Sequence, residues 1–361
     1  MVFNTATLDL FLCVFIYVVA GENRLRNLIL AYTNICLIMY TNFCRKKVNN
    51  KAKISPLSQK FLVRDKMKNY LLLLRPLHWI KNIFVLAALI FGQKLFDPLA
   101  VSRAIGGFFC FSLAASAVYI FNDIFDRKAD SLHPEKSKRP IASGSISIGS
   151  AMTISFICAI AAVVGGFMLA QNFAIIILIY IALIVLYSIG LKRTLILDCV
   201  VISIGFCLRA IAGAVVVGVS ISHWLVICTF ALCLFLAFSK RRSEIAQLQE
   251  NSESFRNTLA GYTPELLAHM LDVTSGLAIV CFLLYATDAV TIEKFGTENL
   301  VYTTPLVLYC IFRFSALIQK GKFSGPVQLI LKDLPFQTGF LLWVVSCIGI
   351  IYADKLGFGT T

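Results

Sequence analysis

The chain has 361 residues, of which 58% are hydrophobic and only 14% are charged. Soluble globular domains carry about 25% charged residues, and a water-soluble fold of this size could not bury so much apolar surface. We therefore expect a protein that crosses a membrane several times, and soluble α/β enzymes are excluded. Apolar runs of nearly bilayer-crossing length recur with little strand alternation, which favours helices over an outer-membrane barrel.

The charge balance is strongly basic, with 33 Lys and Arg against 19 Asp and Glu and a formal net charge of +14. In membrane proteins such an excess marks cytoplasmic loops that contact anionic headgroups. No basic stretch is interleaved with solvent-facing aromatic residues, so we expect membrane lipids as partners and no nucleic acid. Eleven of the 12 cysteines lie in apolar runs without CxxC spacing, which is typical of small buried hydrophobes.

The first 65 residues are predicted to be an N-terminal extension, and residues 66–361 the transmembrane domain. The extension contains two short apolar runs, Leu8–Ala20 and Leu28–Tyr40, which could form a helical hairpin, surface helices or one imperfect pair of spans. Met67 is also a plausible start for a shorter protein.

The rest of the chain is predicted to be all-α, with about nine transmembrane helices. They are expected at 78–96, 103–125, 148–170, 173–190, 198–218, 222–239, 266–288, 299–318 and 336–353. The loops 127–147, 191–197, 240–265 and 319–335 contain fourteen Lys and Arg, which places them in the cytoplasm. The polar motifs lie in these same loops, so we predict a site that opens to the cytoplasm.

The most informative motif lies where the second predicted helix ends. Asn122, Asp126 and Asp130 recur every four residues, and a continuous helix would place them along one face. Such a ladder of oxygen atoms suits Mg²⁺ shared with a diphosphate, and carboxylates at membrane depth are costly and usually functional. Asn122, Asp123, Asp126 and Asp130 are therefore candidate catalytic residues, the first, third and fourth as metal ligands. The cations that follow, Lys136, Lys138 and Arg139, are candidates for binding phosphate oxygens.

The stretch NDIFDRKAD with its basic tail HPEKSKRPIASG resembles the first aspartate-rich motif, NDxxDxxxD, of UbiA-type intramembrane prenyltransferases. The stretch from Arg75 to Asn82 resembles the RPxxWxKN start of their first core helix, and includes the candidate substrate ligand Lys81. The likeness covers about residues 69–353. It implies a UbiA-like bundle of about nine helices, with a cytoplasm-facing active-site cavity that binds a diphosphate through Mg²⁺.

Later stretches resemble one branch of that family, the decaprenyl-phosphate phosphoribosyltransferases. The matching segments are 187–198, 205–213, 222–224 and 238–244. The resemblance implies transfer of 5-phosphoribose from phosphoribosyl diphosphate to a polyprenyl phosphate, for lipid-linked arabinose and cell-envelope polysaccharide synthesis in a bacterial inner membrane. The further substrate-binding residues implied are Tyr187, Lys192, Asp198, Arg209, Lys240, Arg241 and Glu244.

The loop after the sixth predicted helix departs from the wider family. Aromatic prenyltransferases carry a second carboxylate motif, DxxxD, at this place, whereas this chain has Lys240-Arg241-Arg242-Ser-Glu244. Phosphoribosyl diphosphate and a lipid phosphate bring more negative groups than a prenyl diphosphate does, and Lys and Arg suit that charge. Arg242 is equally well explained as a topology anchor.

Several alternatives stay open from the residues alone. Arg209, embedded in a helix, could reach a phosphate or pair with a carboxylate such as Asp272. The competing enzyme is an aromatic, 4-hydroxybenzoate-type polyprenyltransferase of quinone biosynthesis, which shares the fold and the first motif. A neighbouring branch, usually fused to a soluble hydrolase-like domain, shares much of the later pattern. Outside the enzymes, a membrane transporter or a lipid-binding protein is the alternative function. A homo-oligomer is compatible with the sequence.

Overall fold

The computed structural model describes residues 68–132, 136–249, 261–321, 323 and 325–353. The predicted N-terminal extension lies outside this part of the chain. Within it, the backbone forms helices and turns and no strand. Nine helices in these residues are long and apolar enough to cross a membrane, which confirms the predicted all-α, multi-pass architecture.

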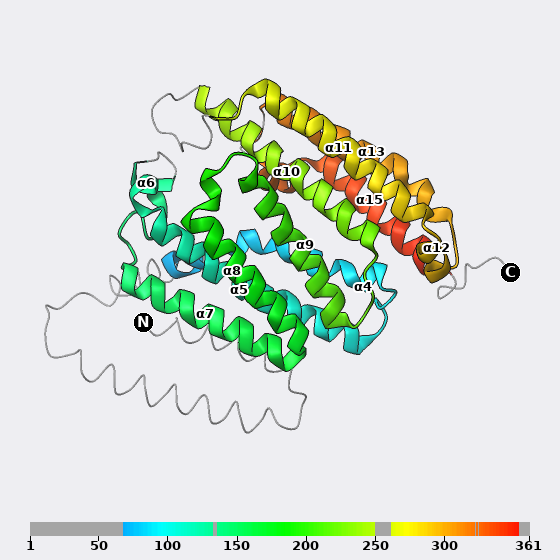
Figure 1. The fold of residues 1–361 in the computed structure, drawn as a ribbon, viewed down its shortest axis with the longest axis horizontal. Coiled ribbons are helices and arrows are strands. Elements are labelled where there is room, and N and C mark those ends of the chain that lie inside the picture. The colour runs from blue at the N-terminus through cyan, green and yellow to red at the C-terminus, as the bar shows by residue number, and fades with distance from the viewer. Residues whose placement is uncertain (1–67, 133–135, 250–260, 322, 324, 354–361) are drawn as a thin grey trace, which may run out of the picture. The chain divides into compact units, whose positions relative to one another are not determined.

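The spanning helices can be followed in Figure 1 by their colour, which runs from blue near the N-terminus to red near the C-terminus. They are residues 68–91, which include η1 (Pro76–Val85) and α4 (Ala87–Phe91), then α5 (Pro98–Phe125), α7 (Ile148–Leu169), α8 (Gln171–Ile189), α9 (Leu197–Val217), α10 (His223–Gln249), α11 (Pro264–Thr287), η5 with α13 (Asn299–Thr303, Thr304–Gln319) and α15 (Leu334–Ile351). Shorter helices lie in the connections: α6 (Arg127–Ser131), η2 (Lys136–Lys138), η3 (Leu191–Arg193), α12 (Ala289–Phe295) and α14 (Pro326–Lys332).

Two helices differ from their predicted form. The first was expected at 78–96, but the span covers residues 68–91 and includes η1 and α4. It is broken at 75–76, because Arg75 has a left-handed backbone (φ 53°) and Pro76 cannot continue the preceding α-helix. The sixth predicted helix was expected to end at 239, but α10 continues to Gln249. Lys, Arg and Glu are good helix formers, and Lys240 and Glu244 pair across one turn at 3.7 Å. The cationic residues after Ser239 are therefore held on a helix and not in a loop.

The structure divides into two compact units. The first comprises the described residues up to Ile80 together with Ile105–Ala174. In it, the Ser155 hydroxyl on α7 donates to the Ala117 carbonyl oxygen on α5 at 2.8 Å. An apolar cluster formed by Leu73, Ile120, Ile141, Ile146 and Ala151 packs the segment after η2 against α5 and the start of α7. This cluster holds the basic tail of the first motif next to the end of α5.

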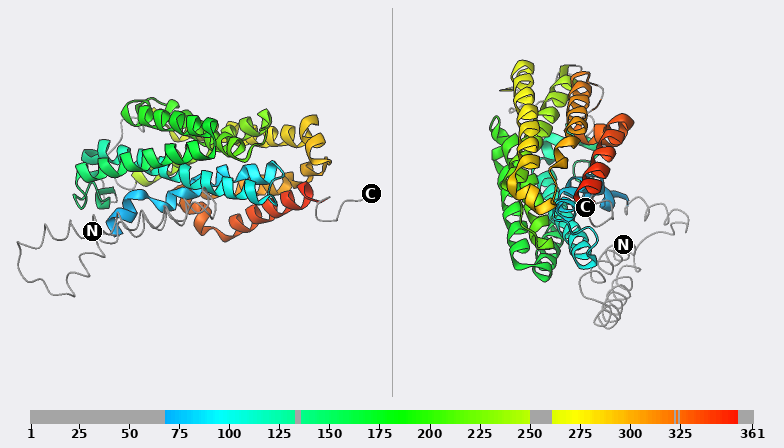
Figure 2. Two further views of the ribbon diagram at one scale, coloured as in Figure 1. Left: turned by 90° about the horizontal axis from the view of Figure 1, so that it is seen from below. Right: turned by 90° about the vertical axis from the view of Figure 1, so that its right-hand side faces the viewer.

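The second unit comprises Lys81–Ala104 and the chain from Ile175 onward. Its helices α10, α11, α13 and α15 run along one another, as Figures 1 and 2 show. Phe235 on α10 and Phe314 on α13 pack with ring centroids 5.4 Å apart, in a core that also contains Leu267 and Leu271 of α11. This core fixes α10 and so places the cations at its end.

At Gly213, α9 passes close to the first span. A Cβ atom added there would overlap the carbonyl oxygen of Val85 in η1, whereas a Cβ added at Gly276 of α11 would meet nothing within 4 Å. We expect Gly213→Ala to lower the free energy of unfolding by about 2 kcal/mol, and Gly276→Ala to leave it unchanged or raise it. Thermal unfolding of the purified protein in detergent measures both. Equal effects of the two variants would contradict a close approach at Gly213.

Candidate active site

The Asn122–Asp126–Asp130 ladder keeps helical spacing although α5 ends at Phe125. The Asp126 amide donates to the Asn122 carbonyl oxygen at 2.9 Å, and the Asp130 amide to the Asp126 carbonyl oxygen at 2.8 Å. The Asn122 side-chain amide also donates to the Asp126 carboxylate at 2.9 Å. Asn122 and Asp126 are half-buried, whereas Asp130 is buried. The two half-buried side chains therefore lie next to each other at the end of α5.

Asp123 and Asp130 are held by arginines. The Arg75 guanidinium lies 2.5 Å from the Asp123 carboxylate, and Arg139 lies 3.0 Å from the same oxygen atom. Arg139 also pairs with Asp130 at 2.5 Å. We call Arg75, Asp123, Asp130 and Arg139 the arginine clamp. Asp123 is almost fully buried, and its carboxylate forms ion pairs with these two arginines.

Loss of Arg75 should destabilise the first unit. Arg75→Met would leave the Asp123 carboxylate buried with Arg139 as its remaining clamp partner, and breaking a buried ion pair on one side costs about 3 kcal/mol. We expect the free energy of unfolding to fall by about that amount. Thermal unfolding in detergent measures it, with Arg103→Met as a control because Arg103 is an exposed residue on α5. A loss no larger than that of the control would show that the pair with Arg75 adds nothing to stability.

The remaining predicted residues of the first unit lie on the segment after α6. Lys136 is half-buried and Lys138 is exposed, both within η2. Among the residues that the structure describes, no three Asp, Glu, His or Cys side chains are grouped as a preformed metal cage needs. Mg²⁺ does not need such a cage, because it takes one or two carboxylates from protein and the rest of its ligands from phosphate and water. The pair Asn122 and Asp126 fits that requirement.

A second polar cluster lies in the second unit, at the end of α10. The Arg241 guanidinium is buried, with its Nε 2.7 Å from the Asp198 carboxylate and its Nη1 2.5 Å from Glu244. Its Nη2 lies 3.5 Å from the Tyr187 hydroxyl oxygen. Lys240 reaches the other oxygen of Glu244 at 3.7 Å. We call Tyr187, Asp198, Lys240, Arg241 and Glu244 the Arg241 cluster, and all five are residues that the sequence analysis assigned to substrate binding.

Lys192 and Lys81 belong to the same unit but to other elements. Lys192 is buried on η3, the turn between α8 and α9, and Lys81 is half-buried on η1. Lys81 thus lies inside the first span, whereas Lys192 lies in the turn just before α9. Their assignment to substrate binding stays a prediction.

Arg209 forms a separate group in the middle of α9. Its Nε donates to Asn82 at 2.7 Å, its Nη2 to the Tyr180 hydroxyl at 2.8 Å and its Nη1 to the Gly205 carbonyl at 2.7 Å. The guanidinium carbon also lies 4.7 Å from the centre of the Tyr180 ring. Asp272, considered as a partner from the sequence, is exposed on α11. The contacts described for Arg209 thus tie α8, α9 and the first span together.

Comparison with known proteins decides the family. The model described as "UbiA prenyltransferase family" matches residues 82–331. The chain belongs to this family. It is 32% identical over 288 residues to the decaprenyl-phosphate phosphoribosyltransferase of Mycolicibacterium smegmatis, covering 77% of this chain and 91% of the relative. It is also 32% identical over 292 residues to the protein of the same name from Corynebacterium glutamicum, covering 77% of this chain and 85% of that one.

The fold agrees with solved structures of the UbiA family. A UbiA homolog from Archaeoglobus fulgidus bound to GPP and Mg²⁺ matches with a TM-score of 0.59 and 19% identity, over 78% of this chain and 99% of that one. A further structure of a UbiA homolog from Archaeoglobus fulgidus matches with a TM-score of 0.58. At this identity the likeness establishes the helical bundle, and it confirms the fold predicted from the sequence.

Two residues that contact the predicted site residues were not themselves predicted, Arg75 of the arginine clamp and Tyr262 beside the Arg241 cluster. Arg75 stands in the RPxxWxKN motif, so its position was visible in the sequence but its partner Asp123 was not. Tyr262 precedes α11, and its hydroxyl donates to Asp198 at 2.7 Å. No motif marks Tyr262, and its contact with Asp198 joins residues 64 positions apart.

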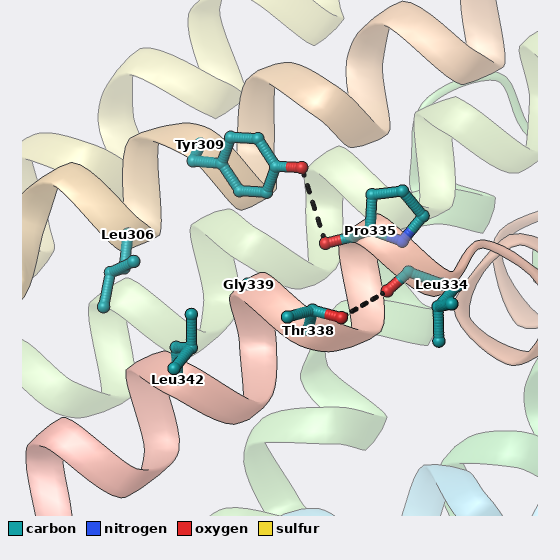
Figure 3. Close-up of a pocket in the computed structure, with 7 residues that line it drawn as sticks. All are labelled: Leu306, Tyr309, Leu334, Pro335, Thr338, Gly339 and Leu342. Atoms are coloured by element: carbon teal, nitrogen blue, oxygen red, sulfur yellow. Dashed lines mark hydrogen bonds between the residues drawn. The ribbon is translucent and has the colours of Figure 1, made fainter.

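A groove of about 450 Å³ lies between α13 and α15, and none of the seven residues that line it is charged (Figure 3). It is lined by Leu306, Tyr309, Leu334, Pro335, Thr338, Gly339 and Leu342. The Tyr309 hydroxyl points towards the Pro335 carbonyl oxygen at 3.5 Å, and Thr338 bonds to the backbone of its own helix. The groove therefore offers no group for phosphate or metal chemistry.

Proposed function

We propose that this UbiA-family transferase moves 5-phosphoribose from phosphoribosyl diphosphate to a polyprenyl phosphate of the decaprenyl type and releases diphosphate. The observation that carries the proposal is the 32% identity to two proteins named decaprenyl-phosphate phosphoribosyltransferase, over 77% of this chain. The Arg241 cluster supports it. In this cluster α10 carries two cations and one glutamate, at the place where the family's aromatic prenyltransferases carry a second carboxylate motif, DxxxD. Those cations suit a substrate with additional phosphate groups.

The first unit supplies the groups that bind the diphosphate of the donor. Asn122 and Asp126 would hold Mg²⁺, which when bound spreads the negative charge of the departing diphosphate. Lys136 and Lys138 provide further cations for its oxygen atoms. The arginine clamp keeps Asp123 and Asp130 in fixed positions, so that α5, α6 and the basic tail form one rigid support.

The transfer itself needs positioning and charge stabilisation rather than a covalent enzyme intermediate. The bond between C1 of the ribose and the diphosphate oxygen breaks, and its electron pair leaves with the diphosphate. An oxygen of the lipid phosphate forms the new bond to C1. A phosphate oxyanion is already a nucleophile, so the step needs no strong general base. Lys192, Arg209, Lys240 and Arg241 are assigned to the remaining phosphates of donor and acceptor.

The side of the membrane follows from charge. The Arg241 cluster and the first motif both adjoin the loops that contain fourteen of the chain's 33 Lys and Arg, and positive loops face the cytoplasm. We infer a bacterial inner-membrane protein whose active site opens to the cytoplasm, where a soluble sugar diphosphate is available. The product would serve cell-envelope polysaccharide synthesis.

The decisive experiment offers the purified protein in lipid two pairs of labelled substrates. One pair is phosphoribosyl diphosphate with decaprenyl phosphate, and the other is prenyl diphosphate with 4-hydroxybenzoate. We expect label from phosphoribosyl diphosphate in the lipid phase with the first pair and no product with the second. Product from the second pair alone would show an aromatic prenyltransferase and overturn the proposal.

Metal dependence gives a separate prediction. Removing divalent cations with EDTA should abolish transfer, and adding Mg²⁺ should restore it, because Asn122 and Asp126 alone cannot neutralise a diphosphate. The measurement is diphosphate release before and after chelation, with the melting temperature followed in parallel. Full activity in excess EDTA would contradict the assignment of a metal to this pair.

A further inference from the structure

Tyr262 is a buried residue that joins three helices of the second unit. It lies just before α11, and its side chain is 4% exposed. Its hydroxyl donates to the Asp198 carboxylate of α9 at 2.7 Å and accepts a hydrogen bond from the Ile196 amide at 2.9 Å. Asp198 in turn pairs with Arg241 of α10 at 2.7 Å. One hydroxyl therefore connects the beginnings of α9 and α11 with the end of α10.

The Ile196 contact fixes a strained turn. Ile196 precedes α9 and has a left-handed backbone with φ 67°, which a β-branched residue rarely adopts. The turn leads directly from η3, which carries Lys192, to Asp198. Such a strained backbone persists only where contacts with the surrounding structure stabilise it. The hydrogen bond from the Ile196 amide to Tyr262 is one of these contacts.

The Asp198 contact orients a carboxylate that cannot itself reach a substrate. Asp198 is 0% exposed. One of its oxygen atoms accepts from Tyr262 and the other faces the Nε atom of Arg241. Burial and the hydrogen bond to Asp198 raise the pKa of Tyr262 above its ordinary value, so the hydroxyl remains protonated and continues to donate.

We propose that Tyr262 is a positioning residue, which holds Asp198 and the Ile196 turn so that Arg241 presents its guanidinium to a phosphate group of the donor. This inference rests on the proposed function. Arg241 pairs with the buried Asp198 at Nε, while its Nη1 pairs with Glu244, which is about a quarter exposed. A phosphate of the donor would therefore meet the guanidinium on the Nη side by taking the place of Glu244. Without the Tyr262 hydroxyl, the Asp198 carboxylate can rotate and Arg241 turns with it.

The test compares Tyr262→Phe with Tyr352→Phe. The Tyr352 hydroxyl is also buried, accepting from the Leu95 amide at 2.9 Å and donating to the Leu89 carbonyl at 2.8 Å. Each variant loses a buried hydroxyl that accepts a hydrogen bond from a backbone amide and donates to an oxygen atom. We expect Tyr262→Phe to raise the KM for phosphoribosyl diphosphate about tenfold with an unchanged KM for decaprenyl phosphate. Tyr352→Phe should change neither KM, although both variants lower the melting temperature to a similar extent.

A second readout is independent of activity. Hydrogen–deuterium exchange should become faster at the amides of residues 196–198 in Tyr262→Phe but not in Tyr352→Phe, because the Ile196 amide loses its acceptor. If the wild type transfers phosphoribose and Tyr262→Phe has an unchanged donor KM, the positioning role is overturned. Absence of any phosphoribosyl transfer by the wild type would instead overturn the proposed function, and unchanged exchange at residues 196–198 would then refute the Tyr262 contact by itself.

Discussion

Replacing Asp126 by asparagine is expected to lower phosphoribosyl transfer about a thousandfold while the protein stays folded in the membrane. Asp126 is half-buried and lies beside Asn122, with its carboxylate accepting the Asn122 side-chain amide at 2.9 Å. It is thus the acidic side chain of the ladder that is not held in the arginine clamp. Asparagine keeps the size of the side chain but removes the negative charge that a divalent cation needs.

The measurement is the kcat for diphosphate release at saturating donor and acceptor, together with the melting temperature. Glu293→Gln is the matched control, because it also converts a carboxylate to an amide, on the exposed connection α12. We expect the control to keep wild-type turnover and both variants to unfold near the wild-type temperature. Wild-type turnover in Asp126→Asn would remove Asp126 from the site.

The fold was predictable because its main determinants are local. Hydropathy along the chain sets the number and order of the spanning helices, since a bilayer leaves helices as the structure that satisfies the backbone within each segment. Element ends were less predictable. α10 runs on to Gln249 because its end is rich in helix formers and Ile245 packs against the core that contains Leu267, a contact that hydropathy does not encode. The break at Pro76 depends on a single proline, and a hydropathy average over many residues does not show it.

The candidate site was predictable where a motif carries the chemistry on consecutive turns. Asn122 and Asp126 are neighbours on one helix, so their spacing alone implies that they meet. The partners of Asp123 and Asp198 could not be found in this way. Arg75 and Asp123 are 48 positions apart, and Tyr262 and Asp198 are 64 apart, so chain topology and not local spacing brings them together. The sequence shows which charges exist, whereas the fold decides which of them neutralise one another.

That distinction matters most for Arg241, whose charge is shared among several groups. Asp198 is fully buried and takes Nε, while Glu244 is about a quarter exposed and takes Nη1. The buried partner is the structural one, because removing the arginine would leave an uncompensated charge in the core. The partly exposed partner is the one that a phosphate can replace. A variant that tests binding must therefore keep the charge next to Asp198.

Arg241→Lys meets that requirement, and we expect it to raise the KM for phosphoribosyl diphosphate at least about tenfold with little change in the KM for decaprenyl phosphate. A lysine ammonium can pair with Asp198 but cannot also extend a planar fork towards Glu244 and an incoming phosphate. The loss should therefore appear in donor binding and not in folding. Initial rates over a range of donor concentrations, with direct titration of phosphoribosyl diphosphate, measure it.

Arg313→Lys is the matched control in the same unit. Arg313 holds Asp333 through Nε at 2.8 Å and Nη2 at 3.0 Å, so this variant also exchanges a forked arginine for lysine beside a buried aspartate. Asp333 caps the start of α15 and is not assigned to substrate binding. A decrease in melting temperature common to both variants therefore reports the weakened ion pair. A donor KM raised equally in both would mean that the effect is structural. A donor KM unchanged in Arg241→Lys would reduce Arg241 to an anchor at the membrane surface, and a rise confined to Arg241→Lys assigns the phosphate to its guanidinium.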